Sequence, residues 1–204
     1  MMTFEISFHL INLAANEALP TFGGDSSAVW VKSGSLDCSG RDISQGEGIY
    51  VSGPTAVATQ PSTLVVFHIS PLAAQIEPVL SARFEWEGHA VLRLDRVSFP
   101  PGARAYRHVH PGPGIRVLTQ GTLDIRSDHE CTLMHNGDAW FEDANSPVQA
   151  TAGKEPTAFV RAMVLPPEFL GKPTLRLLDA EDHDKPRLQT NTRFFDQIID
   201  LSGP

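Results

Sequence analysis

The stretch Pro101-Gly-Ala-Arg-Ala-Tyr-Arg-His-Val-His-Pro-Gly-Pro-Gly-Ile-Arg-Val-Leu-Thr-Gln-Gly121 decides the fold of this chain. It contains two histidines, His108 and His110, that are separated by one residue. Because alternate residues of a β-strand point to the same face, both imidazoles are expected to face one core or cavity. Pro-Gly pairs precede and follow the histidines, which predicts turns at both ends of the strand.

The composition favours a folded β protein. With 204 residues, the chain is long enough for one domain or two small ones. Hydrophobic residues make up 41%, which is enough for a buried core. The 16 glycines and 16 prolines are spread along the chain, which is typical of short strands joined by tight turns.

The net charge and the number of cysteines indicate which partners and which cellular compartment to expect. A net charge of −8 argues against nucleic acid or an anionic membrane surface as a partner, because both require a basic surface. Cys38 and Cys131 are too few for a disulfide framework and indicate thiols in a reducing compartment. The sequence shows neither a signal peptide nor an apolar run of about 20 residues, so we expect a cytoplasmic protein without a membrane span.

Alternating apolar residues predict strands through most of the chain. The expected strands are 1–8, 27–32, 35–38, 46–52, 62–69, 90–99, 122–125, 131–134, 137–143, 148–150 and 158–165. The best candidate for a helix is Ala73–Glu85, with Pro78 near one end. The charged tail from Pro173 ends in an apolar cluster, Phe194–Leu201, for which docking on a neighbouring subunit is one possibility.

A repeat lies within this pattern. Placing Gly34 on Gly121 aligns Ser35-Leu36-Asp37 with Thr122-Leu123-Asp124, and placing Gly46 on Gly137 aligns Glu47 with Asp138, Tyr50 with Phe141 and Val57 with Val148. Turns at this spacing suggest a sandwich or barrel, so two copies predict two similar barrels. In the first copy Thr21 and Gly23 take the places of His108 and His110. Any site is therefore expected in the second copy.

These residues resemble the cupins, small β-barrels of the double-stranded β-helix type. Their first motif, G-x5-H-x-H-x3-E-x6-G, is matched in spacing from Gly102 to Gly121, with Gly114 in the place of the glutamate. Their second motif begins at Gly137 with G-D, and Val148 takes the place of its histidine. The resemblance is strong over 88–165 and weaker over 25–70.

The resemblance implies an all-β chain with two cupin jelly-roll barrels in tandem. The chain looks like a bicupin of the quercetin-dioxygenase-like or conserved-barrel type, with a degenerate metal motif. We expect a degenerate N-terminal barrel at 1–80 and a C-terminal barrel at 81–204 that carries the His-x-His motif and the tail. Cupin barrels commonly associate through their sheets, so a homodimer is implied.

The resemblance also implies a metal position. In cupins two histidines, a glutamate and a later histidine bind one iron, manganese, zinc or nickel ion, and only the two histidines carry over, onto His108 and His110. Stable transition-metal sites generally have three or four protein ligands. A third ligand would have to come from another residue, from a substrate or from water. The candidate side chains are Gln149, Glu142 and Asp143.

Strand parity predicts substrate-binding side chains beside the histidines. Counting back from His108 in a regular strand places Tyr106 and Arg104 on the inner face, and counting from Gly114 places Arg116 there. A guanidinium binds a carboxylate in a forked geometry, so Arg116 with Arg104 could hold a small acid. Tyr106 could orient the ligand.

Two hypotheses for the function follow. The first is a small-molecule-binding cupin, which as an enzyme would carry out a metal-dependent dioxygenase-like or isomerase-like reaction on a small organic acid or aromatic compound. The second is a non-catalytic ligand-binding or sensor cupin that has lost its metal site. Gly114 and Val148 favour the second hypothesis, since they replace two of the four metal ligands.

Overall fold

The computed structural model describes residues 1–22, 26–53, 55–71, 76–128 and 130–202. Within these ranges nearly all regular structure is β, which confirms the expected fold class. The chain divides into two compact units, 1–94 with 194–204, and 95–193. None of the helices in the described ranges is long and apolar enough to span a membrane.

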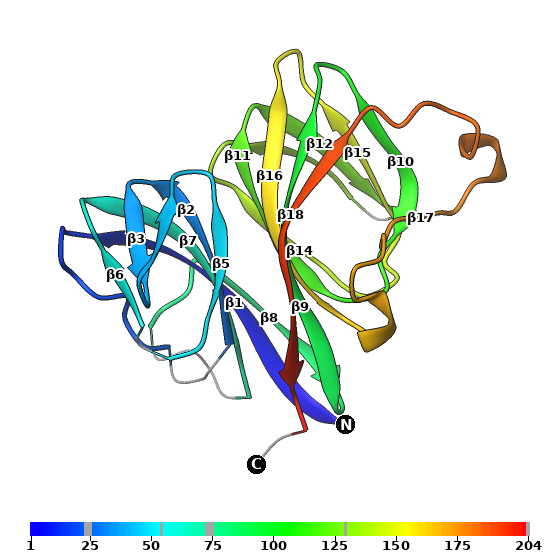
Figure 1. The fold of residues 1–204 in the computed structure, drawn as a ribbon. Coiled ribbons are helices and arrows are strands. Elements are labelled where there is room, and N and C mark those ends of the chain that lie inside the picture. Colours follow the sequence, from blue (N-terminus) through cyan, green and yellow to red (C-terminus); the bar gives the residue numbers. More distant parts are fainter. Residues whose placement is uncertain (23–25, 54, 72–75, 129, 203–204) are drawn as a thin grey trace. The chain divides into compact units, whose positions relative to one another are not determined.

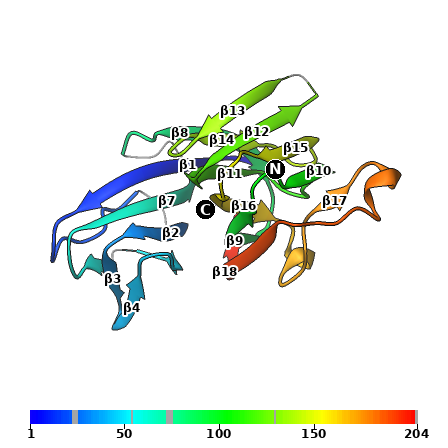
Figure 2. The same cartoon turned by 90° about the horizontal axis from the view of Figure 1, so that it is seen from above.

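The first unit contains two sheets. One sheet has the strand order β5-β2-β7-β1-β8 and the other has the order β4-β3-β6. Their bounds are β1 Met2–Leu13, β2 Ser26–Ser33, β3 Ser35–Cys38, β4 Arg41–Ser44, β5 Gly48–Val51, β6 Ala56–Ala58, β7 Ser62–Ser70 and β8 Leu80–Trp86. β1, β7 and β2 run side by side as antiparallel neighbours (Figure 2). Buried side chains of both sheets form one hydrophobic core, to which Val29, Leu36 and Leu64 belong.

The second unit also contains two sheets, to which β9 and β18 contribute part of their length. The orders are β14-β11-β16-β9-β18 and β13-β12-β15-β10-β17 (Figure 1; β13 is labelled in Figure 2). The bounds are β9 His89–Phe99, β10 Arg104–Val109, β11 Gly114–Gln120, β12 Thr122–Ser127, β13 Cys131–His135, β14 Ala139–Glu142, β15 Val148–Ala152, β16 Thr157–Leu165, β17 Arg176–Leu177 and β18 Thr190–Asp200. Two 3-10 turns, η1 Pro167–Phe169 and η2 Ala180–Asp182, precede β18. Leu123, Ala150 and Phe159 belong to the core of this unit.

The two units repeat the same local hydrogen bonds at the positions that the sequence repeat aligns. Gly46 N donates to Val31 O at 2.8 Å, and Gly137 N donates to Leu118 O at the same distance. The strand orders β5-β2-β7-β1 and β14-β11-β16-β9 correspond as well. The sequence repeat is therefore a structural repeat. The division into a degenerate N-terminal barrel at 1–80 and a C-terminal barrel at 81–204 stays a prediction.

The helix predicted at Ala73–Glu85 is wrong over its second half. Leu80–Trp86 form strand β8, which pairs with β1. Leu80, Ala82, Phe84 and Trp86 are more buried than the residues between them, which is the period of a strand. Residues 72–75, where the helix was expected to begin, lie outside the described residues.

The apolar cluster in the tail belongs to a strand of its own chain. Phe194–Leu201 overlap β18, which joins the sheet beside β9. Within the first unit, the ring centroid of Phe195 lies 6.0 Å from that of Tyr50. The cluster therefore has intramolecular partners, and no neighbouring subunit is required to explain its apolar character.

Candidate functional site

The two histidines lie together in the second unit. His108 is near the end of β10, and His110 follows the strand directly. Both are buried, and their ring centroids are 4.9 Å apart at an interplanar angle of 83°. The His-x-His sequence thus places two imidazoles in contact within the barrel.

His110 is held at both ring nitrogens. Arg161 Nη1 lies 3.1 Å from His110 Nε2, and because arginine nitrogens only donate, Nε2 must accept. The proton is then on Nδ1, which donates to Thr174 Oγ1 at 3.2 Å. Burial, reinforced by the charge of Arg161, holds the pKa of His110 well below its usual value, so the ring is neutral.

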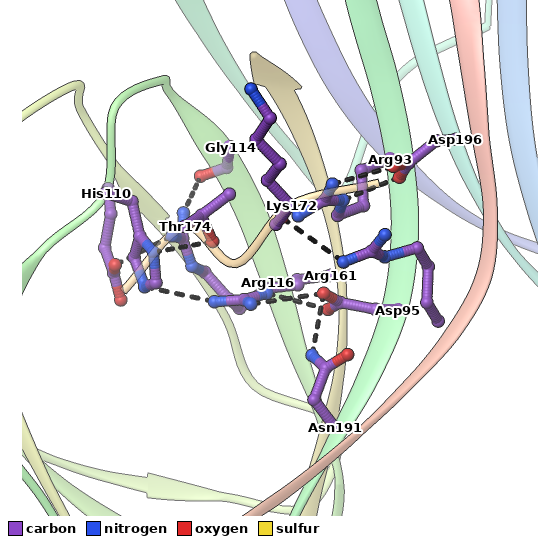
Figure 3. A network of polar contacts seen from close by, with 12 residues as sticks. Arg93, Asp95, His110, Gly114, Arg116, Arg161, Lys172, Thr174, Asn191 and Asp196 are labelled. Carbon is purple, nitrogen blue, oxygen red and sulfur yellow. Dashed lines mark hydrogen bonds and ion pairs between the residues drawn. The ribbon is translucent and has the colours of Figure 1, made fainter. Parts of the chain in front are cut away.

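Arg161 is fixed from its other side by a buried carboxylate. Asp95 accepts from Arg161 Nε at 2.7 Å and from Nη2 at 3.1 Å, which is the forked geometry of an arginine–carboxylate pair. Asn191 Nδ2 donates to the same carboxylate at 2.8 Å. Figure 3 shows the resulting chain from His110 through Arg161 and Asp95 to Asn191. The lone pair on His110 Nε2 therefore already accepts a hydrogen bond from the guanidinium group of Arg161.

Arg116 is buried, as strand parity predicts, and it has its own carboxylate. Its Nη2 lies 2.8 Å from Glu142 Oε2, and its Nη1 donates to Gly114 O at 2.6 Å. Burial lowers the pKa of Arg116 to about 10, while the charge of Glu142 opposes this shift. Trp140 Nε1 donates to the other oxygen of Glu142 at 2.8 Å. The guanidinium thus belongs to a charge-balanced pair rather than to an open anion clamp.

His108 is held at one ring nitrogen by the backbone of its own strand. Its Nδ1 lies 2.7 Å from Tyr106 O, and because a carbonyl only accepts, Nδ1 carries the proton. Burial lowers the pKa of His108, although the charge of Glu142 acts in the opposite direction. The lone pair is then on Nε2, to which no side chain in the described part of the site donates a hydrogen bond.

The inner-face orientation expected for Arg104 is wrong. The register of β10 against β15 shifts between Ala105 and His108, so the regular alternation is broken there. As a result Ala105 is in the core and Arg104 is exposed. Tyr106 is half-buried, and Lys185 Nζ lies 5.3 Å from its ring centroid. A clamp of Arg104 with Arg116 is therefore excluded.

A cavity of about 440 Å³ opens beside Val148 and Glu142. Its walls come from β12, β13 and β14 and from the turn before β15. Ile125, Met134, Trp140, Phe141, Pro147 and Val148 form its apolar lining. This size is within the range of small-molecule sites, which are mostly apolar with a few polar groups.

The residues present do not fit the metal site of the cupins. The described residues contain no cluster of three or more His, Cys, Asp or Glu side chains that could hold an ion. A Cβ at Gly114 would be 2.3 Å from Ala162 O, so the place of the glutamate has no room for a side chain. Of the two histidines, His110 already accepts from Arg161 at Nε2. The donor set that these side chains offer is therefore too small for the ion that the family binds.

The three other candidate metal ligands do not complete the set of side chains that a metal ion would need. Glu142 is paired with Arg116. Gln149 lies between the buried residues Val148 and Ala150 on β15, so it points to the opposite face. Asp143 is exposed, and its Oδ1 accepts from Ala144 N.

Four residues of this network were missed by reasoning from the sequence: Asp95, Arg161, Thr174 and Asn191. Arg161 lies in a strand whose residues are all buried, and Asp95 lies within a run of six buried residues, Ala90–Asp95. A charged residue inside such a run was the available signal, because a buried charge requires a partner. The partners themselves are far apart in sequence and meet only in the folded chain.

The first barrel also contains two buried histidines, although not at the aligned positions. Ser7 Oγ lies 2.9 Å from His9 Nε2, and Ser27 Oγ lies 3.0 Å from His68 Nδ1. The ring of Phe22 contacts both imidazoles, with centroid distances of 4.8 and 5.4 Å. The aligned position 23 lies outside the described residues. The sequence alignment missed this polar cluster because its members come from other strands.

Comparison with solved structures supports the fold. Neither a protein-family model nor a curated protein sequence matches the chain. Among solved structures, AerE from Microcystis aeruginosa has a TM-score of 0.57 at 11% identity, covering 79% of this chain and 88% of its own. Salicylate 1,2-dioxygenase from Pseudaminobacter salicylatoxidans has a TM-score of 0.52 at 13% identity, covering 78% and 70%.

A third solved structure is itself described as a cupin. The cupin 2 conserved barrel domain protein from Leptotrichia buccalis has a TM-score of 0.50 at 15% identity, covering 78% of this chain and 84% of its own. The chain has the cupin fold, which confirms the resemblance seen in the sequence. At these identities the similarity shows the fold and assigns no activity.

Proposed function

We propose that this protein is a small-molecule-binding cupin whose second barrel binds an organic ligand without a metal ion. The observation that carries this proposal is the cavity of about 440 Å³ beside Val148. Val148 stands where cupins have a metal-binding histidine, and here its side chain adds apolar surface to the cavity wall. We therefore expect an organic ligand, and not a metal ion, to bind in this cavity.

The buried ion pairs of the second unit support this function by shaping the barrel. Arg161 with Asp95 holds His110, and Arg116 with Glu142 holds the wall of the cavity. We assign these groups to positioning, because each charge is already balanced within the protein. His108 Nε2 is an acceptor that a ligand or a water molecule can use.

A ligand screen with a metal control tests the proposal. Elemental analysis of protein purified without a histidine tag is expected to give less than about 0.1 equivalent of iron, zinc, manganese or nickel. Thermal stabilisation by a small organic compound is expected to survive addition of a chelator. About one equivalent of metal, with stabilisation that the chelator abolishes, would instead establish the metal-dependent hypothesis.

A homodimer stays a prediction from the family resemblance. Sedimentation velocity at micromolar concentration is expected to give a species of twice the 22.2 kDa chain mass. A single species at the chain mass over the same concentrations would contradict it.

A further inference from the structure

We infer that the cavity of the second barrel selects an organic cation with an apolar body over a small organic acid. The inference rests on the proposed function, because it names the class of ligand for the same cavity. It differs from the expectation of an acid-binding site with arginines as the anion clamp.

Among the described residues, the charged side chains that line the cavity all have the same sign. They are Asp128, Glu130, Glu142 and Asp143, and the described lining contains no Lys, Arg or His. A carboxylate ligand would approach four carboxylates, whereas an ammonium group would be attracted to them. At contact distances one such charge pair favours the bound state by about fivefold in water and by more near a protein surface.

The nearby guanidinium groups cannot reverse this preference. Arg116 is paired with Glu142 at 2.8 Å, and Arg107 is paired with Asp128 at 2.8 Å. After these two pairs are counted, Glu130 and Asp143 leave the rim with a net negative charge. For a buried guanidinium such as Arg116, release of its partner to an incoming anion would leave a buried carboxylate without its cation.

The rest of the lining matches the apolar part of such a ligand. Trp140 and Phe141 lie in β14, and Ile125, Met134 and Val148 come from the neighbouring strands. Aromatic faces also attract cations. The cavity therefore combines an apolar, aromatic wall with an acidic rim, which is the complement of an amine on a hydrocarbon or aromatic body.

A ligand series of one shape and three charges tests the inference. 2-Phenylethylamine, 2-phenylethanol and phenylacetate are titrated into the full-length protein at low salt, by calorimetry or ligand-observed NMR. The amine is expected to bind about fivefold more tightly than the alcohol, since one screened charge pair supplies about that factor. Phenylacetate is expected to bind more weakly than the alcohol. Added salt should reduce the advantage of the amine.

A charge-neutral variant identifies the groups responsible. Glu130→Gln with Asp143→Asn keeps the shape of the rim and leaves one carbonyl oxygen on each side chain, and both carboxylates are exposed. This variant should bind the amine and the alcohol equally, with the affinity for the alcohol unchanged. Glu155→Gln removes an exposed carboxylate that does not line the cavity, so it should behave as the unmodified protein.

The outcomes separate this inference from the proposed function. Binding of phenylacetate or the alcohol as tightly as the amine would overturn the selection for cations and leave small-molecule binding in place. A preference for the amine that the double variant retains would also overturn it, because the rim would not be the cause. If no member binds and the ligand screen gives no stabilisation, the proposed function itself fails.

Discussion

Gly114 shows at the scale of one residue why the cupin metal motif is incomplete. The motif places a glutamate there, but a Cβ at this position would be 2.3 Å from Ala162 O and 2.9 Å from Met163 Cγ. The closer atom is backbone, so the neighbouring strand β16 would have to move. Restoring the glutamate therefore requires more than a change of one side chain.

The Gly114→Ala variant is expected to be less stable by about 1–3 kcal/mol, the usual cost of overpacking. Its free energy of unfolding can be measured with urea, followed by circular dichroism. Unchanged stability would contradict the close approach of β11 and β16 at this position.

Arg161 and Asp95 are expected to be strongly coupled. Arg161→Met leaves the buried Asp95 carboxylate without its cation and should cost about 3–5 kcal/mol. The double variant Arg161→Met with Asp95→Asn removes both charges, so its loss should be smaller than the sum of the two single losses. A double-mutant cycle on urea midpoints measures this difference, and additive losses would exclude the buried pair.

At the scale of one element, strand β18 in the charged C-terminal tail is held by a buried ion pair. Within the first unit, Arg93 Nε donates to Asp196 Oδ1 at 2.6 Å and its Nη2 donates to Oδ2 at 2.7 Å. Both side chains are buried, with 2% and 7% exposed. The forked pair joins β9 to the C-terminal strand, so residues that look like a solvated tail in the sequence are part of the core architecture.

Asp196→Ala is expected to destabilise the first unit by about 3–5 kcal/mol, because it leaves the buried Arg93 guanidinium without this carboxylate. The matched control on the same strand is Asp200→Ala, whose Oδ1 lies 3.4 Å from His89 Nδ1 in a contact with 62–64% of both side chains exposed. Exposed pairs contribute about 0–1 kcal/mol, so the control should change little. Equal losses in urea unfolding of the two variants would exclude a special role for the buried pair.

At the scale of the whole molecule, each of the two units encloses neutral histidines. His9 lies in the first unit, and His108 and His110 lie in the second. Burial lowers the pKa of all three below the ordinary value of 6.5. Both units are therefore expected to lose stability in acid.

Stability is expected to be fully present above pH 6.5 and to fall as the pH drops below it. In that range the histidines of the unfolded chain bind protons, whereas the buried histidines of the folded chain stay neutral, and this difference favours unfolding. Each such histidine adds a slope of up to about 1.4 kcal/mol per pH unit. The melting temperature measured from pH 7.5 to 5 should therefore decrease. The exposed His135→Asn variant should keep this profile, and a flat profile would contradict burial of the neutral rings.

The sequence predicted the strands and the repeat well because their signals are local. Alternation and turn residues indicated most of the strands, and Gly34 and Gly121 marked equivalent turns. The short strands β4, β6 and β17 and the C-terminal strand β18 were not predicted. The helix at Ala73–Glu85 failed over Leu80–Trp86 because pairing with β1 decides the structure there. For the site, the sequence found the histidine pair and the burial of Arg116, but a β-bulge removed Arg104 from the inner face.

By itself, the sequence determined that this chain is an all-β protein with a repeated cupin barrel and with two metal ligands replaced by Gly114 and Val148. Only the tertiary structure decided what the remaining polar groups do. Arg161, Asp95 and Asn191 are distant in sequence, and they meet around His110 because their strands are neighbours in the fold. The sequence motif shows which side chains are present. Contacts between strands that are distant in sequence decide which of their hydrogen-bonding groups and charges already have partners.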